Sequence, residues 1–301
     1  MSRGPDFICI GLQKAGTRWL YDQMASADGV WMPPIKELNY FNGNPFKALN
    51  LRALAKRDAA LAQGEAESAA NSSFYETFKR GMASPVDLDW YYELFAAKGS
   101  NLAGDVSPEY AKMEVDKIGL VTSACPGCKF VLLLRDPVSR FWSVACQNVR
   151  QGILAEQDLG DWRCVSQLVA KSVHQAQSFP TRIWRKWSTK LPPSALRFWF
   201  LEDIVARPED VRQEIFDFVG GSKLQSPLSP SFNRKSNNKK YAMSDEIQHQ
   251  LAVYFNAEIR QAADLFGAHA VAWKKKNDAV LQAVQRGRPL TSIAHDGRLE
   301  R

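Results

Sequence analysis

The stretch FICIGLQKAGTRWLYDQM, residues 7–24, decides how the chain begins to fold. Residues 7–12 are almost all apolar, as in a strand that is buried on both faces of a parallel sheet. A glycine-bounded loop, residues 11–16, interrupts this run, and apolar residues then recur at helical spacing up to Met24. Thr17 is the expected cap of that helix. The stretch therefore predicts a strand, a tight loop and a helix.

A loop between a buried strand and a helix favours an anion, because it offers backbone N–H groups and the positive end of the helix dipole. An ATP-binding loop reads G-x-x-x-x-G-K-[ST], with the lysine directly after the second glycine. Here Thr17 and Arg18 follow Gly16, and the lysine comes two positions earlier, at Lys14. We therefore predict a phosphate loop whose lysine is aimed differently from the lysine of an ATP-binding loop. On this stretch alone, an ordinary strand, turn and helix stays an open alternative.

Size and charge limit the class of protein. The chain has 301 residues, of which 45% are hydrophobic and 24% charged, which fits one large α/β domain of a soluble protein. No apolar run approaches the length of a membrane helix, and a strand at residue 7 leaves no room for a signal peptide, so we expect a cytoplasmic location. The net charge of +7 fits an anionic ligand, and no basic and aromatic repeat predicts a nucleic-acid partner.

The cysteines and histidines predict no metal site. Five cysteines are an odd number without secretory context, so we expect no disulfide framework. Cys125 and Cys128 lack a second cysteine pair or a nearby histidine, and we interpret them as turn residues. The four histidines are scattered without ligand spacing.

Strands and helices alternate along the rest of the chain. The further segments are buried strands over 129–134 and 196–201 and helices over 137–152, 204–219 and 244–266. This order predicts an α/β fold, a single domain with a mainly parallel central sheet flanked by helices and a P-loop-like strand-loop-helix. Ligands of such sheets bind at the carboxyl ends of the strands.

Two regions show no visible chemistry. Residues 43–86 form a variable insert, in which the alanine-rich segment 53–70 is expected to be a surface helix or a mobile insert. The main domain is predicted to cover residues 1–270. Residues 271–301 are expected to form a basic tail whose charges are solvated.

The stretch RDPVSRFWS, residues 135–143, supplies a second anion-binding motif. Arg135 stands at the carboxyl end of a predicted strand, and Ser143 lies two turns into the following helix. An arginine that forks onto a phosphate and a serine hydroxyl on the same anion make a phosphate site separate from the loop. The two motifs together predict a ligand with phosphates at two places.

With these motifs the chain resembles the sulfotransferases that use 3'-phosphoadenosine 5'-phosphosulfate. Residues 11–18 are similar to their 5'-phosphosulfate loop with its early lysine, and residues 135–143 are similar to their 3'-phosphate motif. The resemblance spans residues 5–270 and implies transfer of a sulfuryl group to an acceptor hydroxyl by in-line displacement. It implies no metal. A P-loop-type kinase using ATP and magnesium, or a catalytically inactive relative, stays an alternative.

Further segments resemble the carbohydrate, heparan-sulfate-type branch of that family. KELNYF, residues 36–41, and GDVSPEY, residues 104–110, are similar to its acceptor-side motifs, and residues 231–241 stand in the place of a late cofactor-covering loop. Val106 and Asn39 replace the usual lysine and histidine of the branch, which weakens the expectation of a strongly anionic acceptor. We expect a carbohydrate or a small metabolite.

The resemblance also implies roles for individual residues. Lys14 would stabilise the leaving phosphate, and Glu37 would take the acceptor proton with a pKa that desolvation raises toward neutrality. Lys36 and Asp105 would lie near the acceptor, although a solvated Lys36–Glu37 charge pair and a strand-end cap at Asp105 are the plainer readings. The expected cofactor ligands are Lys14, Ala15, Gly16, Thr17, Arg18, Arg135, Ser143, Lys239 and Lys240.

Overall fold

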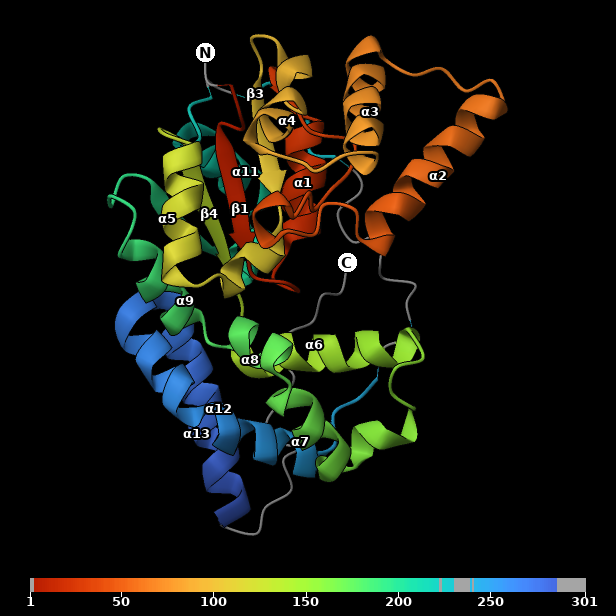
Figure 1. Cartoon of the computed structure of the whole chain (residues 1–301). Helices are drawn as coiled ribbons and strands as arrows, with labels where there is room; N and C mark the ends of the chain where they lie inside the picture. The colour runs from red at the N-terminus through yellow and green to blue at the C-terminus, as the bar shows by residue number, and fades with distance from the viewer. Residues whose placement is uncertain (1–2, 222–223, 230–238, 240, 286–301) are drawn as a thin grey trace.

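A parallel sheet forms the centre of the molecule. The computed structural model describes residues 3–221, 224–229, 239 and 241–285. Its strands are β1 (Phe7–Gly11), β2 (Val30–Trp31), β3 (Leu102–Val106), β4 (Lys129–Leu134) and β5 (Leu196–Phe200). They lie in the order β2-β3-β1-β4-β5, and every neighbouring pair is parallel (Figure 1). The predicted α/β fold is confirmed.

Helices connect the strands and cover the sheet. The α-helices are α1 (Thr17–Ala25), α2 (Ala48–Ala62), α3 (Ala69–Met82), α4 (Leu88–Glu93), α5 (Val115–Ala124), α6 (Pro137–Arg150), α7 (Trp162–Ala170), α8 (Ser172–Ser178), α9 (Pro180–Ser188), α10 (Leu201–Ala206), α11 (Pro208–Phe218), α12 (Asp245–Phe266) and α13 (Ala268–Gln285). Short 3-10 helices are η1 (Tyr40–Asn42), η2 (Ala96–Lys98), η3 (Pro108–Lys112) and η4 (Gln157–Gly160). Helix α1 contacts α11, and α5 contacts α9; α6, α7, α8, α12 and α13 gather below the strands in Figure 1.

The central strand β1 is buried along its whole length between β3 and β4. Phe7 on β1 lies opposite Gly104 on β3 in the register of the sheet. A Cβ atom at position 104 would come 2.1 Å from Cζ of Phe7. The phenyl ring thus occupies the space that a side chain at position 104 would need, which explains a glycine inside a central strand.

The predicted helices agree with the structure at α6 and α12 but not at α10 and α11. Asp136 caps α6 by accepting from the backbone N–H groups of Val138 and Ser139, and Pro137 is the first helical residue, as expected. The single helix predicted over 204–219 is wrong. The chain forms two helices there, because Pro208 has no backbone N–H to continue the first helix and instead begins the second.

The region predicted as an insert contains two helices rather than one. Helix α2 ends at Ala62 and α3 begins at Ala69, so the alanine-rich segment 53–70 is divided between them. Helix α2 buries only Asn50 and Leu54 and diverges from α3 in Figure 1. It is attached through its N-terminal turn and, further along, through Arg57 over the ring of Tyr75 and Asp58 paired with Lys79 on α3.

The segment after residue 270 continues the fold. Helix α13 packs along α12, and Trp273 is buried, with its indole N–H donating to Glu202 at 2.7 Å. Lys275 and Lys276 are exposed on the same helix, as expected for solvated charges. Within the described part of the chain, no helix combines the length and apolar character that a membrane crossing requires.

We expect Gly104→Ala to lower the free energy of unfolding by about 1–3 kcal/mol or more, because the new methyl group must displace the Phe7 ring. Urea unfolding followed by circular dichroism measures this loss. The matched control is Gly119→Ala on α5, where an added Cβ meets nothing within 4 Å and the helix gains about 0.5–1 kcal/mol. Equal stability of the two variants would contradict the packing described for β1.

Candidate active site

The phosphate loop ends at a backbone conformation that only glycine adopts without strain. Gly16 has a φ of 101°, and an added Cβ would lie 3.2 Å from the side chains of Leu201 and Ile204 on α10. The prediction that Thr17 caps α1 is wrong, because Gly16 takes the cap position and Thr17 is the first helical residue. The first N–H groups of α1 have no carbonyl partner within the helix, so this end of the loop keeps its anion-binding character.

Two arginines hold the main chain of the loop. Arg135, directly after β4, donates from Nη1 to the carbonyl oxygen of Lys14 at 2.9 Å. Arg140, one turn into α6, donates from Nη1 to the carbonyl oxygen of Gln13 at 3.4 Å and from Nη2 to Ser178. The two contacts fasten consecutive peptide units of the loop to the β4–α6 segment.

Both arginines are desolvated. Arg140 is 1% exposed, and burial together with the nearby charge of Arg135 lowers its pKa to about 9. Burial also lowers the pKa of Arg135, although Asp136 opposes this effect. Among the described residues, the hydrogen bonds of these guanidinium groups go to carbonyl and hydroxyl oxygens, and Nε of Arg140 is buried without a partner. Desolvated cations without a carboxylate partner fit an anionic ligand such as a phosphate group.

Helix α6 places Ser143 on the face that meets the loop. Nζ of Lys14 donates to Oε1 of Gln147 at 3.0 Å, so the two residues join the loop to α6. Arg140 and Gln147 flank Ser143 at helical spacing, and each contacts the loop. The two predicted phosphate motifs are therefore neighbours in space.

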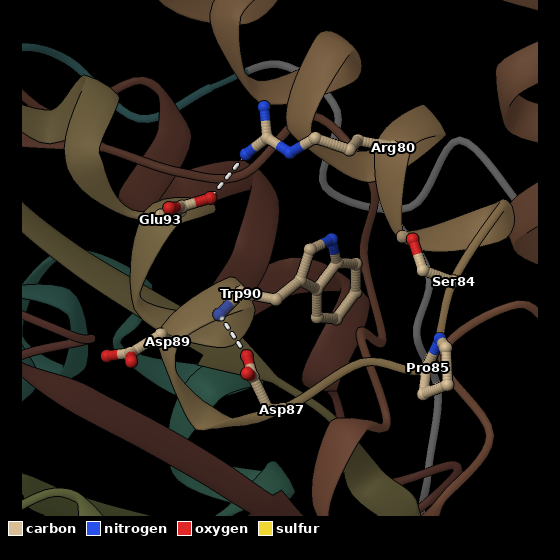
Figure 2. Close-up of a pocket in the computed structure, with 8 residues that line it drawn as sticks. Arg80, Ser84, Pro85, Asp87, Asp89, Trp90 and Glu93 are labelled. Carbon is tan, nitrogen blue, oxygen red and sulfur yellow. Dashed lines mark hydrogen bonds and ion pairs between the residues drawn. The ribbon is translucent and has the colours of Figure 1, made fainter.

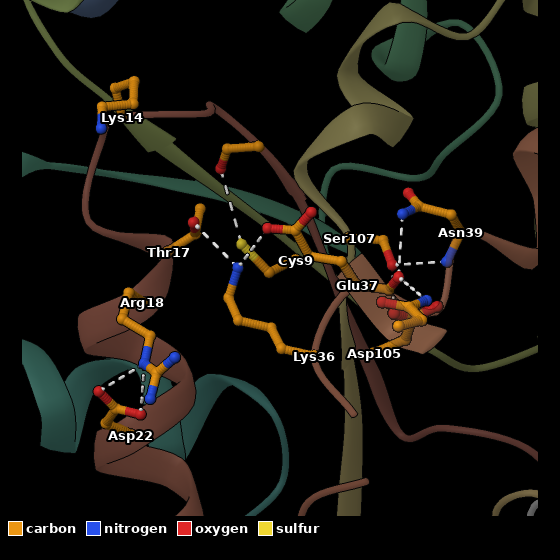
Figure 3. A network of polar contacts seen from close by, with 12 residues as sticks. Cys9, Lys14, Thr17, Arg18, Asp22, Lys36, Glu37, Asn39, Asp105 and Ser107 are labelled. Carbon is orange, nitrogen blue, oxygen red and sulfur yellow. Dashed lines mark hydrogen bonds and ion pairs between the residues drawn. The ribbon is translucent and has the colours of Figure 1, made fainter. Parts of the chain in front are cut away.

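Lys36 links the phosphate loop to Glu37. Its Nζ lies 3.5 Å from Oγ1 of Thr17 and 3.0 Å from Oε1 of Glu37. Figure 3 shows this ammonium group between the first turn of α1 and the carboxylate, with Lys14 lying apart from them. The side chain of Lys36 is 14% exposed, so the plainer reading of a solvated Lys36–Glu37 pair does not describe the structure.

Glu37 is held at both its side chain and its main chain. Lys47 donates from Nζ to Oε2 at 2.6 Å, while Lys36 occupies Oε1. The amide groups of Asn39 and Asn50 both donate to the carbonyl oxygen of Glu37, at 2.9 Å and 3.0 Å. These bonds support a backbone with a φ of 68°, in the left-handed region that few non-glycine residues adopt.

The predicted rise in the pKa of Glu37 is wrong. Burial by itself raises that pKa, but the charges and hydrogen bonds of Lys36 and Lys47 outweigh it and hold the pKa below its ordinary value. The carboxylate is therefore ionised at neutral pH.

Asp105 lies behind this turn. Its carboxylate is 1% exposed and accepts from the hydroxyl groups of Tyr91 at 3.0 Å, Ser107 at 2.6 Å and Tyr110 at 2.9 Å. Burial raises the pKa of Asp105, and the three hydrogen bonds act against that rise. Oγ of Ser107 also accepts from the backbone N–H of Asn39 at 3.1 Å. Asp105 thus lies near the end of β3, supports the turn that carries Glu37 and presents no open carboxylate to an acceptor.

Three other predicted ligands lie differently from the expectation. The backbone N–H of Ala15 donates to the carbonyl oxygen of Leu12 at 3.1 Å and is occupied within the loop. The side chain of Arg18 bends to Asp22 at 2.9 Å, so only its main chain faces the loop (Figure 3). Lys239 is exposed and pairs with Glu156.

The described part of the late loop lies against α6. The carbonyl oxygen of Lys239 accepts from Arg150 at 3.2 Å, and that of Tyr241 accepts from the indole N–H of Trp142 at 3.0 Å. Lys240 lies outside the described residues. The late segment is thus brought to the helix that carries Ser143.

Sequence reasoning missed Lys47, Asn50 and Gln147. Each lies 10 or more positions from its partner along the chain, and none belongs to a recognised motif. The only available signal was the position of Lys47 just before a helix. A shallow pocket of about 240 Å³ between α3 and α4, lined by Arg80, Asp87 and Trp90, contains none of the predicted site residues (Figure 2).

A model of the sulfotransferase family matches residues 5–223, most of the chain. The chain belongs to the sulfotransferase family. This range includes the phosphate loop, the Lys36–Glu37 turn and Arg135. A comparison with curated proteins gives no match. The family membership confirms the recognition made from the sequence, while the carbohydrate branch stays a prediction.

Solved sulfotransferase structures share this fold. A sulfotransferase from Alicyclobacillus acidocaldarius superposes with a TM-score of 0.63 at 18% identity, covering 90% of this chain and 98% of its own. The sulfotransferase domain of the Synechococcus PCC 7002 olefin synthase superposes with a TM-score of 0.50 at 15% identity, covering 74% of this chain and 75% of its own. The sulfotransferase domain from the curacin biosynthetic pathway superposes with a TM-score of 0.50 at 18% identity, covering 76% of this chain and 77% of its own.

Metal-ligating side chains do not cluster in the described ranges: no group of three or more His, Cys, Asp or Glu residues is placed to hold an ion. The cations of the site belong to lysine and arginine side chains.

The lowered pKa of Glu37 predicts an acid-sensitive contribution to stability. The folded state favours the ionised form of Glu37, which therefore contributes to the free energy of unfolding. This contribution is fully present above the ordinary glutamate pKa of 4.5 and is lost as the pH falls through the pKa of the folded state. We expect the difference in unfolding free energy between the wild type and Glu37→Gln to shrink from about pH 5 to about pH 3. Urea unfolding at several pH values measures it. Glu246→Gln, at an exposed position in the first turn of α12, is the control, and a constant difference for Glu37→Gln would contradict the ion pairs.

Proposed function

We propose that this sulfotransferase moves the sulfuryl group of 3'-phosphoadenosine 5'-phosphosulfate to a hydroxyl of a carbohydrate or small-molecule acceptor, in the cytoplasm. One observation carries the proposal. The ammonium group of Lys36 lies between Thr17, at the phosphate loop, and Glu37, the carboxylate that the family resemblance implies as base. This contact supports a single site that includes the loop and the proposed base.

The residues that would hold the cofactor come from both motifs. The N–H groups of Gly16, Thr17 and Arg18 would bind the 5' phosphosulfate, since the start of a helix favours an anion. Arg135 and Ser143 would bind the 3'-phosphate, which fits the desolvated guanidinium group on one side of the loop. When bound, the cofactor supplies a sulfuryl group whose bond to the bridging phosphate oxygen breaks as a bond to the acceptor oxygen forms.

Glu37 would accept the proton of the acceptor hydroxyl. Its carboxylate is ionised at neutral pH, which is the form that a general base needs. An acceptor hydroxyl that displaces one ammonium group from the carboxylate would raise the pKa of Glu37 toward the range in which proton transfer is efficient.

The lysines would offset negative charge at the leaving oxygen. Lys36 already lies beside the loop, and Lys14 lies on the loop itself with its ammonium group on Gln147. Cations at the point where charge develops are a large source of rate enhancement, and they make a metal ion unnecessary for this step.

We expect Glu37→Gln to keep its affinity for adenosine 3',5'-bisphosphate and to lose transfer by about 10²–10⁴-fold, because the amide cannot take a proton. Transfer of radioactive sulfur from the cofactor to a panel of sugar, phenol and alcohol acceptors measures the rate. Lys14→Ala should also lose turnover, while Glu76→Gln, at an exposed position on α3, should not. A fully active Glu37→Gln enzyme would remove Glu37 as the base.

A further inference from the structure

The first turn of helix α2 reaches into the candidate active site. Lys47 directly precedes the helix, and Asn50 lies in its first turn. Nζ of Lys47 donates to Oε2 of Glu37 at 2.6 Å, and Nδ2 of Asn50 donates to the carbonyl oxygen of Glu37 at 3.0 Å. The same amide group of Asn50 also donates to the carbonyl oxygen of Pro45 at 2.9 Å, which closes the loop before the helix.

These contacts are shielded from water. Asn50 is fully buried, and the side chains of Lys47 and Glu37 are 15% and 21% exposed. A charged hydrogen bond at this depth is stronger than one on the surface, and removing one partner leaves the other charge poorly solvated. The rest of α2 buries little, and its other contacts are those of Arg57 and Asp58 with Tyr75 and Lys79 on α3.

We propose that Lys47 and Asn50 are positioning residues that fix the carboxylate and the main chain of Glu37, so that the insert helix α2 is a working part of the active site. The inference rests on the proposed function only where it treats Glu37 as the base. The contacts themselves do not depend on which cofactor or acceptor binds.

The charges that face Glu37 make the role of Lys47 measurable. Lys36 faces Oε1 from the same turn, Lys47 faces Oε2 from α2, and Thr17 meets Lys36 from α1. Asp105 and Cys9, on the adjacent strands β3 and β1, interact with Lys36 rather than with Glu37. Removing the charge of Lys47 therefore takes away one of the two cations on the carboxylate and leaves the other unchanged.

The experiment is a titration of Glu37 by carbon-13 NMR in the full chain, with the side-chain carboxyl carbon labelled and assigned by its loss in Glu37→Gln. We expect an upward shift of the pKa of Glu37 in Lys47→Met, and a value near that of the wild type in Lys47→Arg, which restores the charge. Lys56→Met is the matched control, because Lys56 is exposed on the same helix, and it should leave the pKa of Glu37 unchanged.

Three outcomes decide the proposal. A shift in Lys47→Met that Lys47→Arg reverses supports it. The same pKa in Lys47→Met as in Lys56→Met overturns it, and so does a shift that Lys47→Arg fails to reverse. If Lys47→Met does not fold, Lys47→Gln removes the charge while keeping a polar end and is judged by the same criteria.

The test is independent of the proposed function, because it needs neither cofactor nor acceptor. Binding of adenosine 3',5'-bisphosphate, measured separately on the same proteins, reports on the cofactor site. A shifted pKa of Glu37 without nucleotide binding would support the positioning role of Lys47 and contradict the proposed cofactor. Nucleotide binding with an unshifted pKa would support the cofactor and contradict the positioning role.

Discussion

The hold of two arginines on consecutive carbonyl groups of the phosphate loop is the interaction on which the site depends. Arg135 and Arg140 donate to Lys14 and Gln13, and both have given up most of their hydration to do so. Desolvating a guanidinium group is costly unless it gains strong partners, and neutral carbonyl groups offset this cost only in part. The remaining positive potential next to a helix N-terminus favours an anion at this edge of the sheet.

A second set of contacts fixes the turn that carries Glu37 at the same edge. The chain of bonds runs from buried Asp105 through Ser107 to the backbone of Asn39, and the carbonyl group of Glu37 is bound from two sides. These hydrogen bonds make the arrangement rigid, because breaking any of them leaves a buried polar partner unsatisfied. The same edge of the sheet thus holds the phosphate loop and a fixed carboxylate, joined by Lys36.

Local patterns predicted the parts of the fold that are determined locally. The run FICIG, the glycines of the loop and the Asp136–Pro137 start of α6 act through neighbouring residues, and the structure agrees with them. The sequence could not reveal that Lys47 would lie on Glu37, because the contact depends on how an unmarked insert folds back. For the same reason the expected direction of the Glu37 pKa was wrong. Burial alone raises the pKa of Glu37, and the ammonium groups of Lys36 and Lys47 that outweigh burial are placed by the tertiary structure.

We propose that the site binds a nucleotide with separate 5' and 3' phosphate groups. Calorimetric titration of the wild-type protein with adenosine 3',5'-bisphosphate tests it most directly, with 5'-AMP and with ATP plus magnesium as comparisons. We expect the bisphosphate to bind most tightly, and its advantage over 5'-AMP to be lost in Arg135→Ala, since that arginine would hold the 3'-phosphate. A preference for ATP with magnesium, or equal affinity for 5'-AMP and the bisphosphate, would contradict the account and favour a kinase-type site.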